Sequence, residues 1–272
     1  MKRTLPHLVV EVVAVLLSLL IIIPIYMMVL NSLKDAAGAA EMSLSLPKLW
    51  HIENYVTVYH EARILQALKN SVVITFAAVS GLVLLSAMAG YVIQRRKNMF
   101  TELVNLVLML GLVIPVFMVP TYILAKNLHL TGGLEGMILV SIAIGLPTGV
   151  FLYSGYYKTI PREIDESALL DGCGPYALFF RIILPLLMPI TATNIVIQFL
   201  AIWNDFSTSV YFLNSQAKYN LVMTTFLFFG THSANWNYVF ADLVFVSLPV
   251  LIMYIFLQRY VISGLTSGAI KG

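Results

Sequence analysis

Charged residues are scarce in this sequence. Asp, Glu, Lys and Arg make up 11% of its 272 residues, whereas soluble domains contain about 25%. Hydrophobic residues account for 60% of the chain and form several long, nearly uncharged runs. A lipid bilayer accommodates such runs better than water does, so the sequence predicts an integral membrane protein.

Cysteine is almost absent, and so are the short motifs of common enzymes. Cys173 stands alone, which excludes a disulfide within the chain. The dipeptide Gly-Lys occurs nowhere, which excludes an ATP-binding P-loop. His60 and Glu61 begin a string similar to a zinc-protease motif, but Ile64 stands in place of its second histidine. Neither a Gly-x-Ser-Gly nucleophile nor a TVGYG potassium filter is present, so we expect no enzymatic activity, cofactor or metal site.

Six apolar stretches approach the roughly 20 residues that a helix needs to cross a bilayer. They are Val9–Leu30, Ser71–Ile93, Leu103–Ala125, Met137–Tyr157, Leu186–Trp203 and Val239–Leu257. The first follows Lys2 and Arg3, as a secretory signal would, but it is too long and no small-residue cleavage site follows it closely. The sequence therefore predicts an all-α polytopic membrane protein with six transmembrane helices.

The distribution of Lys and Arg predicts the orientation, because cytoplasmic segments of membrane proteins are enriched in both residues. An even number of crossings places the two termini on the same side. If that side is cytoplasmic, the inner segments hold ten basic residues and the outer segments hold six. The QRRKN sequence at 94–98 is the strongest local signal. We therefore expect both termini and the loop 158–185 in the cytoplasm, and the segments 31–70 and 204–238 outside it.

The segment 161–185 interrupts the apolar pattern with a short polar helix. Pro161 suits a first helical turn, where its missing N–H needs no partner, and acidic residues follow at the positive end of the helix dipole. Gly172 permits an exit through a left-handed conformation, and Pro175 prevents continuation. The helix so defined, Pro161–Asp171, is too short and too charged to cross a bilayer. It must dock into another protein or rest on lipid, and its acidic character disfavours an anionic membrane surface.

The same segment resembles the cytoplasmic loop of ATP-binding-cassette (ABC) importer permeases. That loop has the pattern Glu-Ala-Ala, three residues, Gly, nine residues, Ile, one residue and Leu-Pro. The matching residues here are Glu166-Ser167-Ala168, Gly172, Ile182 and Leu184-Pro185, with Ser167 in place of an alanine. Three further segments resemble carbohydrate permeases of the maltose-transporter type, in particular their six-span subunit. They are QRYVISGLTSGAIKG at 258–272, WNDF at 203–206 and KNS at 69–71.

The resemblance implies a type I ABC importer permease fold in which the short helix couples the chain to a separate ATPase. ATP would bind to that ATPase, so this chain would need no cofactor. The residues assigned to ATPase coupling are Glu163, Ile164, Glu166, Ser167, Ala168, Leu169, Asp171 and Gly172. Ile164, Ala168 and Leu169 are expected to form the apolar docking side. Ile182, Leu184 and Pro185 would support the loop, and the glycine-rich tail 261–272 would form a second ATPase contact.

The resemblance also implies an organisation and a set of partners. Residues 1–66 would form the first transmembrane helix with an extracytoplasmic segment, and residues 67–260 the permease core. The chain would lie in a bacterial or archaeal cytoplasmic membrane. Its partners would be a second permease, two ATPase subunits and an extracytoplasmic sugar-binding protein that contacts the segment 204–238. No interaction with nucleic acid is expected.

Polar residues of the fifth stretch are candidates for the translocation path. Thr191, Asn194, Gln198 and Asp205 are spaced so that they share one side of a helix, and amides can exchange hydrogen bonds with sugar hydroxyls. Hydrogen bonds between neighbouring helices explain the same residues equally well. Asp242, at the outer start of the last stretch, is expected to be interfacial.

Two other functions compete with a sugar importer. An ion-driven secondary transporter requires ionisable residues near the middle of the bilayer, and none of the six stretches carries one there. A permease of the same family for glycerol phosphates, amino acids or peptides is a closer alternative, because the sequence does not name the solute.

Overall fold

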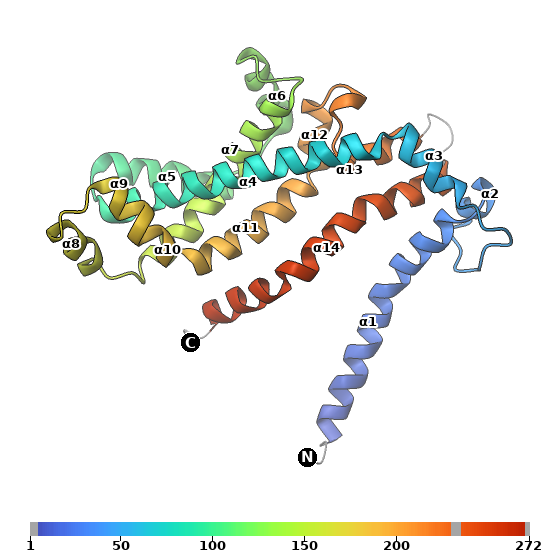
Figure 1. The fold of residues 1–272 in the computed structure, drawn as a ribbon, viewed down its shortest axis with the longest axis horizontal. Coiled ribbons are helices and arrows are strands. Elements are labelled where there is room, and N and C mark those ends of the chain that lie inside the picture. The colour runs from blue at the N-terminus through green and yellow to red at the C-terminus, as the bar shows by residue number, and fades with distance from the viewer. Residues whose placement is uncertain (1–4, 230–234, 270–272) are drawn as a thin grey trace. The chain divides into compact units, whose positions relative to one another are not determined.

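The computed structural model describes residues 5–229 and 235–269, and every regular element in these ranges is a helix (Figure 1). This confirms the predicted all-α class. By its internal contacts the chain divides into two compact units. The first contains residues 1–68 and 223–250, and the second contains residues 69–222 and 251–272.

Four helices are long and apolar enough to span a membrane. They are Val10–Ser32 within α1 (Leu5–Ser32), α4 (Ile64–Arg95), α7 (Leu134–Tyr157) and Trp236–Ile255 within α14 (Trp236–Ala269). A fifth candidate is a pair of helices, Pro175–Leu186 and α11 (Met188–Trp203), which are bent by 77° relative to each other. Length and composition of the described helices thus support four of the six predicted spans, and a fifth in bent form.

The third predicted span, Leu103–Ala125, is not one helix. α5 (Met99–Val113) has 15 residues, and α6 (Met118–Asn127) begins after a short non-helical stretch. Pro115 explains the break, because its ring disfavours a helical conformation for the residue before it, and Ile114 is extended with ψ 120°. The apolar composition of the stretch therefore predicted a membrane environment, but not that the stretch forms two helices in place of one.

In the first unit, a buried asparagine joins three helices. Asn54 lies in α3 (Glu53–Glu61), and its Nδ2 donates hydrogen bonds to the backbone oxygens of Ser32 (2.8 Å) and Lys34 (2.9 Å) at the end of α1. Its Oδ1 accepts a hydrogen bond of 3.0 Å from Nδ2 of Asn237 in the first turn of α14. One amide therefore fixes the segment that follows α1 onto the start of α14.

Asp242 in α14, which the sequence predicts at an interfacial position, is buried within its own chain. The residue is 0% exposed. Its carboxylate oxygens accept hydrogen bonds from Thr224 Oγ1, at 2.9 and 3.1 Å, and from Thr225 Oγ1, at 2.6 Å. These threonines end α13 (Leu221–Thr224) and begin the 3₁₀ helix η3 (Thr225–Phe228). Two hydroxyl donors replace the water that burial removes from the carboxyl group.

In the second unit, glycines let α4 and α7 approach closely. A Cβ atom on Gly149 would lie 2.2 Å from Ser86 Oγ, and one on Gly145 would lie 2.2 Å from Leu82 Cδ1. The two glycines are about one helical turn apart, so α7 presents a strip without side chains to α4. α11 also packs against α7 within this unit (Figure 1).

Two predicted segments differ in detail from the structure or lie partly outside it. The tail 261–272, which the sequence predicts as a flexible glycine-rich segment, is helical as far as Ala269, because α14 continues into it. Residues 270–272 lie outside the described residues. The segment 204–238 forms α12 (Phe206–Phe212), the 3₁₀ helix η2 (Gln216–Lys218), α13, η3 and the start of α14, and its residues 230–234 lie outside the description.

Candidate functional site

The short polar helix that the sequence predicts is present as α8 (Glu163–Leu170). Asp171 caps its C-terminal end, and Gly172 follows with a φ of +79°, which confirms the predicted left-handed exit. The helix begins with three acidic residues in its first turn, Glu163, Asp165 and Glu166. Their position at the positive end of the dipole stabilises a helix of only eight residues.

An ion pair fixes α8 to the end of α4. Arg95 Nε lies 2.5 Å from Asp165 Oδ2, and each of the two side chains is 12% exposed. The Arg95 guanidinium also approaches the backbone oxygen of Ile160 at 3.3 Å, and Arg162 Nη2 donates to the backbone oxygen of Gln94 at 3.1 Å. The last turn of one candidate span and the first turn of α8 are therefore held together by charge and by hydrogen bonds.

Sequence reasoning missed this pair. Asp165 was interpreted only as a favourable charge at a helix start, and Arg95 only as a marker of orientation. An acidic residue in a short helix and a basic residue at the end of a span are visible in the sequence. Their pairing across 70 positions of chain is not, because it depends on how α4 and α7 pack.

One side of α8 faces the interior of the second unit. Ala168 is buried and belongs to a cluster that we call the α7–α8 core, and Ile164 packs against it. The other members of the α7–α8 core are Ala87, Tyr153, Tyr157, Ile160, Leu178, Phe179, Ile183 and Leu187. Ile164 and Ala168, which the sequence predicts on an apolar docking side, thus face the interior of their own chain.

The outward side of α8 carries a different apolar pair. Leu169 is 55% exposed and Leu170 is 89% exposed, whereas exposed Glu163, Glu166 and Ser167 lie on the same helix. The exposed side of α8 therefore carries two leucines together with acidic side chains. The sequence did not mark Leu170 as a site residue.

The residues predicted to support the loop lie on the helix Pro175–Leu186, which consists of α9 (Pro175–Ala177), the π-helical turn η1 (Leu178–Ile183) and α10 (Leu184–Leu186). Ile182 and Leu184 are partly buried against the α7–α8 core, and Pro185 is exposed. The supporting role of these residues stays a prediction.

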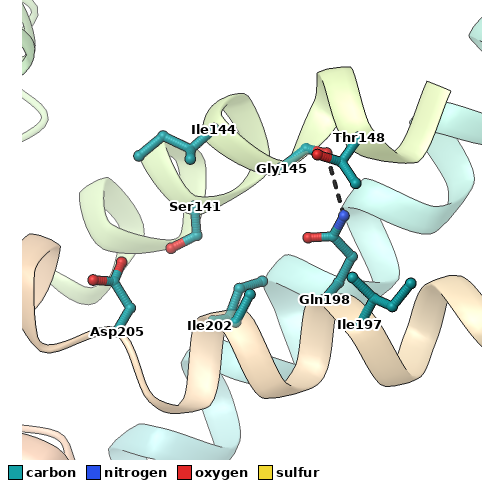
Figure 2. A pocket seen from close by; sticks show the side chains of 9 residues that line it. Ser141, Ile144, Gly145, Thr148, Ile197, Gln198, Ile202 and Asp205 are labelled. Atoms are coloured by element: carbon teal, nitrogen blue, oxygen red, sulfur yellow. Dashed lines mark hydrogen bonds between the residues drawn. The ribbon is translucent and has the colours of Figure 1, made fainter. Parts of the chain in front are cut away.

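A second site lies between α7 and α11. It is a cavity of about 200 Å³ whose polar lining comes from Ser141, Thr148, Gln198 and Asp205 (Figure 2). Gln198 Nε2 donates to the backbone oxygen of Gly145 at 3.3 Å, and Figure 2 shows this amide at the α7 side of the cavity. Hydroxyl and amide groups of this kind suit hydrogen bonds to a neutral polar solute.

The four residues predicted for the translocation path do not form one stripe. Asn194 and Gln198 are buried on α11, and Thr191 accepts a hydrogen bond of 2.9 Å from Tyr153 Oη. Asp205 follows the end of α11 and caps α12, where it accepts a hydrogen bond of 2.9 Å from the backbone N–H of Thr208.

Of these four residues, Gln198 and Asp205 line the cavity, and Thr191 and Asn194 do not. Asp205 is the one ionisable residue of its lining. The described part of the chain also contains no group of three or more His, Cys, Asp or Glu residues that could hold a metal ion. Hydrogen bonding to a solute is thus the chemistry that this cavity offers.

Comparisons with known proteins identify the family. Residues 82–267 match the family model described as "Binding-protein-dependent transport system inner membrane component". A probable permease protein of a starch degradation products transport system, AmyC of Thermoanaerobacterium thermosulfurigenes, is 32% identical over 94% of this chain and 94% of its own length. MelC of Bacillus subtilis, a melibiose, raffinose and stachyose import permease, is 33% identical over 92% of this chain and 91% of its own length.

A solved structure has the same fold. A chain of a bacterial ABC transporter involved in the import of the acidic polysaccharide alginate superposes with a TM-score of 0.79, at 18% identity, over 93% of this chain and 95% of the other. The apolar helices and the family match over more than half of the chain agree with one another. The chain belongs to the family of inner-membrane components of binding-protein-dependent transport systems.

Proposed function

We propose that this chain is a permease subunit of an ATP-driven, binding-protein-dependent importer of oligosaccharides or other sugars. The observation that carries the proposal is the set of solutes that its relatives are named for. Permeases for starch degradation products, for melibiose, raffinose and stachyose, and for arabinooligosaccharides each match over 90% of the chain or more, at 32–33% identity. The hydroxyl and amide groups that line the cavity between α7 and α11, together with the Asp205 carboxylate, can form hydrogen bonds with such solutes.

The proposed arrangement has six crossings with both termini in the cytoplasm. The break between α5 and α6 and the bend before α11 would each lie within one crossing, as non-helical backbone does where protein surrounds it. α1 is exposed along its apolar length from Val10 to Tyr26, which offers a surface to lipid or to a second permease.

Coupling would occur through the outward side of α8. Leu169 and Leu170 provide apolar contact area, Glu163 and Glu166 provide charge at its rim, and Gly172 ends the helix without a side chain in the way. The Arg95–Asp165 pair would transmit a displacement of α8 to α4, since a helix fixed by a buried ion pair moves with its neighbour. Each of two ATPase subunits would engage one permease, so ATP would bind outside this chain.

The hypothesised mechanism is alternating access. ATP binding would draw the ATPase subunits together, α8 would carry that motion into the bundle, and the path would open towards the extracytoplasmic binding protein. The cavity of about 200 Å³ is smaller than the roughly 300–1,000 Å³ of typical ligand sites. A partner permease would therefore be needed to complete a path for an oligosaccharide.

Uptake by cells that lack the gene for this chain tests the proposed substrate class. Deletion should abolish ATP-dependent uptake of one labelled sugar among maltotriose, raffinose and arabinotriose, and the full-length gene should restore it. If deletion instead abolished uptake of glycerol phosphate, an amino acid or a dipeptide and left sugar uptake intact, that solute would be the substrate and the proposed sugar class would be wrong. Uptake that a protonophore abolishes at constant ATP would instead favour an ion-coupled carrier.

Cysteine crosslinking tests the coupling site independently of the solute. A cysteine in place of the exposed Leu170 should crosslink to a co-purified ATPase subunit, whereas one in place of the buried Ala168 should not. Equal crosslinking at both positions, or crosslinking only at Ala168, would contradict the proposed docking side.

A further inference from the structure

Basic side chains surround an open hollow where α4 ends and α7 leads into α8. The hollow has a volume of about 530 Å³ and lies entirely within the second unit. Arg95, Lys97, Lys158 and Arg162 line it together with one acidic residue, Glu163. Four cations around one hollow repel one another, so the site is favourable for an anion.

The four cations differ in how they are engaged. Arg95 pairs with Asp165, and Arg162 donates to the backbone oxygen of Gln94, so the two arginines help to build the wall. For Lys97 and Lys158 the described residues provide no ion pair, and both side chains are exposed. Two ammonium groups are therefore available to a ligand.

The position of the hollow indicates what the anion is. α4 and α7 are candidate spans that end at Arg95 and Tyr157, so a site directly after both ends would lie towards the lipid headgroups if both helices cross the bilayer. Directly beyond Lys97, Met99 is 90% exposed and Phe100 is 72% exposed. Cations next to exposed apolar side chains are typical of segments that contact headgroups and acyl chains together. An acidic protein surface would match the lysines but not this apolar neighbourhood.

We propose that this hollow binds the phosphate group of an anionic phospholipid, with the Lys97 and Lys158 ammonium groups as its ligands. Basic pockets between transmembrane helices on the cytoplasmic side are suited to such headgroups. The bound lipid would lie beside the Arg95–Asp165 junction, where it reinforces the attachment of α8 to α4. This site is separate from the solute path, and Glu163 lies between it and the outward side of α8.

Electron paramagnetic resonance in nanodiscs tests the proposal. The full-length chain, with the subunits that co-purify, is placed in phosphatidylcholine nanodiscs that contain spin-labelled phosphatidylglycerol or, in a parallel sample, spin-labelled phosphatidylcholine. The wild type should immobilise the anionic probe preferentially. The Lys97→Gln/Lys158→Gln variant should lower this preference by about fivefold for each charge removed. The control variant Lys48→Gln/Lys126→Gln loses the same charge at exposed lysines elsewhere and should keep the preference.

Several outcomes would overturn the proposal. Equal losses in both double variants would show that only net charge matters. Complete displacement of the probe by inorganic phosphate would assign the hollow to a free anion. Weaker association of the ATPase with an unchanged lipid preference would assign it to a protein surface. If the glutamine variant unfolds, Lys97→Arg/Lys158→Arg provides the test, because it keeps the charge and should keep the preference.

Discussion

Neutralising Arg95 should weaken the protein and its transport together. In Arg95→Gln the Asp165 carboxylate stays buried at 12% exposure but loses the cation 2.5 Å away. Two unit charges about 4 Å apart attract by roughly 4 kcal/mol at an effective dielectric constant of about 20. Breaking a buried pair by removing one partner typically costs about 3–5 kcal/mol, which agrees with that figure. Arg95→Gln should therefore be strongly destabilising.

Thermal unfolding of the purified complex and sugar uptake provide the assay. A loss of this size should lower the midpoint of unfolding by on the order of 10 °C, because each kcal/mol corresponds to about 2–4 °C in a chain of this length. Uptake should fall as well, since α8 is no longer fixed to α4. The neighbouring Arg96→Gln removes the same charge from an exposed side chain that has no ion pair within the described residues, and it should behave as the wild type.

A double-mutant cycle separates the pair from other effects of Arg95. The variant Arg95→Gln/Asp165→Asn leaves no buried charge unpaired, so it should be more stable than the sum of the single losses by about 1–3 kcal/mol. Additive losses, or equal unfolding midpoints for Arg95→Gln and Arg96→Gln, would refute the reasoning that this pair fixes α8.

Three further variants test other parts of the structure. Gly149→Ala would place a Cβ 2.2 Å from Ser86 Oγ and should lower the free energy of unfolding by about 1–3 kcal/mol. The control Gly155→Ala lies on the same helix, where the new Cβ meets no atom within 4 Å, and it should be tolerated. Gly172→Val forces a β-branched residue to a φ of +79°, so it should abolish ATP-driven uptake although the protein reaches the membrane in normal amounts. Gly174→Val is the control, because the φ of −69° at this position suits valine, and it should retain uptake. Gln198→Ala should raise the KM of sugar uptake about fivefold if this amide binds the solute, and an unchanged KM would assign it to helix packing.

Much of the fold could be predicted because its signals are local. Long apolar runs predicted four of the spans, and Gly172 and Pro175 predicted the end of α8. The expectation that the chain is a transport component and not an enzyme is confirmed by its family. What composition could not predict is the break in the third stretch. The mean hydropathy of a stretch does not show where a residue such as Pro115 interrupts the backbone hydrogen bonds of a helix.

The candidate sites show the same division between local and distant information. The motif on α8 is visible in the sequence, but the burial of Ala168 in its own chain is not, because the α7–α8 core that covers it comes from α4, α7 and η1. Asp205 has the spacing of a helical stripe, yet α11 ends at Trp203. This residue therefore caps the next helix, α12, and lines the cavity from there.

The sequence by itself determined that this is an all-helical membrane chain with a short acidic helix, whose motif resembles that of ABC importer permeases. Hydropathy, helix capping and motif spacing involve neighbouring residues, so they can be recognised in the sequence alone. Only the tertiary structure decided that Arg95 pairs with Asp165, that Leu170 and not Ala168 faces outward, and that lysines from two loops meet at one hollow. These features depend on the packing of α4 against α7, and residues about 60–70 positions apart become neighbours only through that packing.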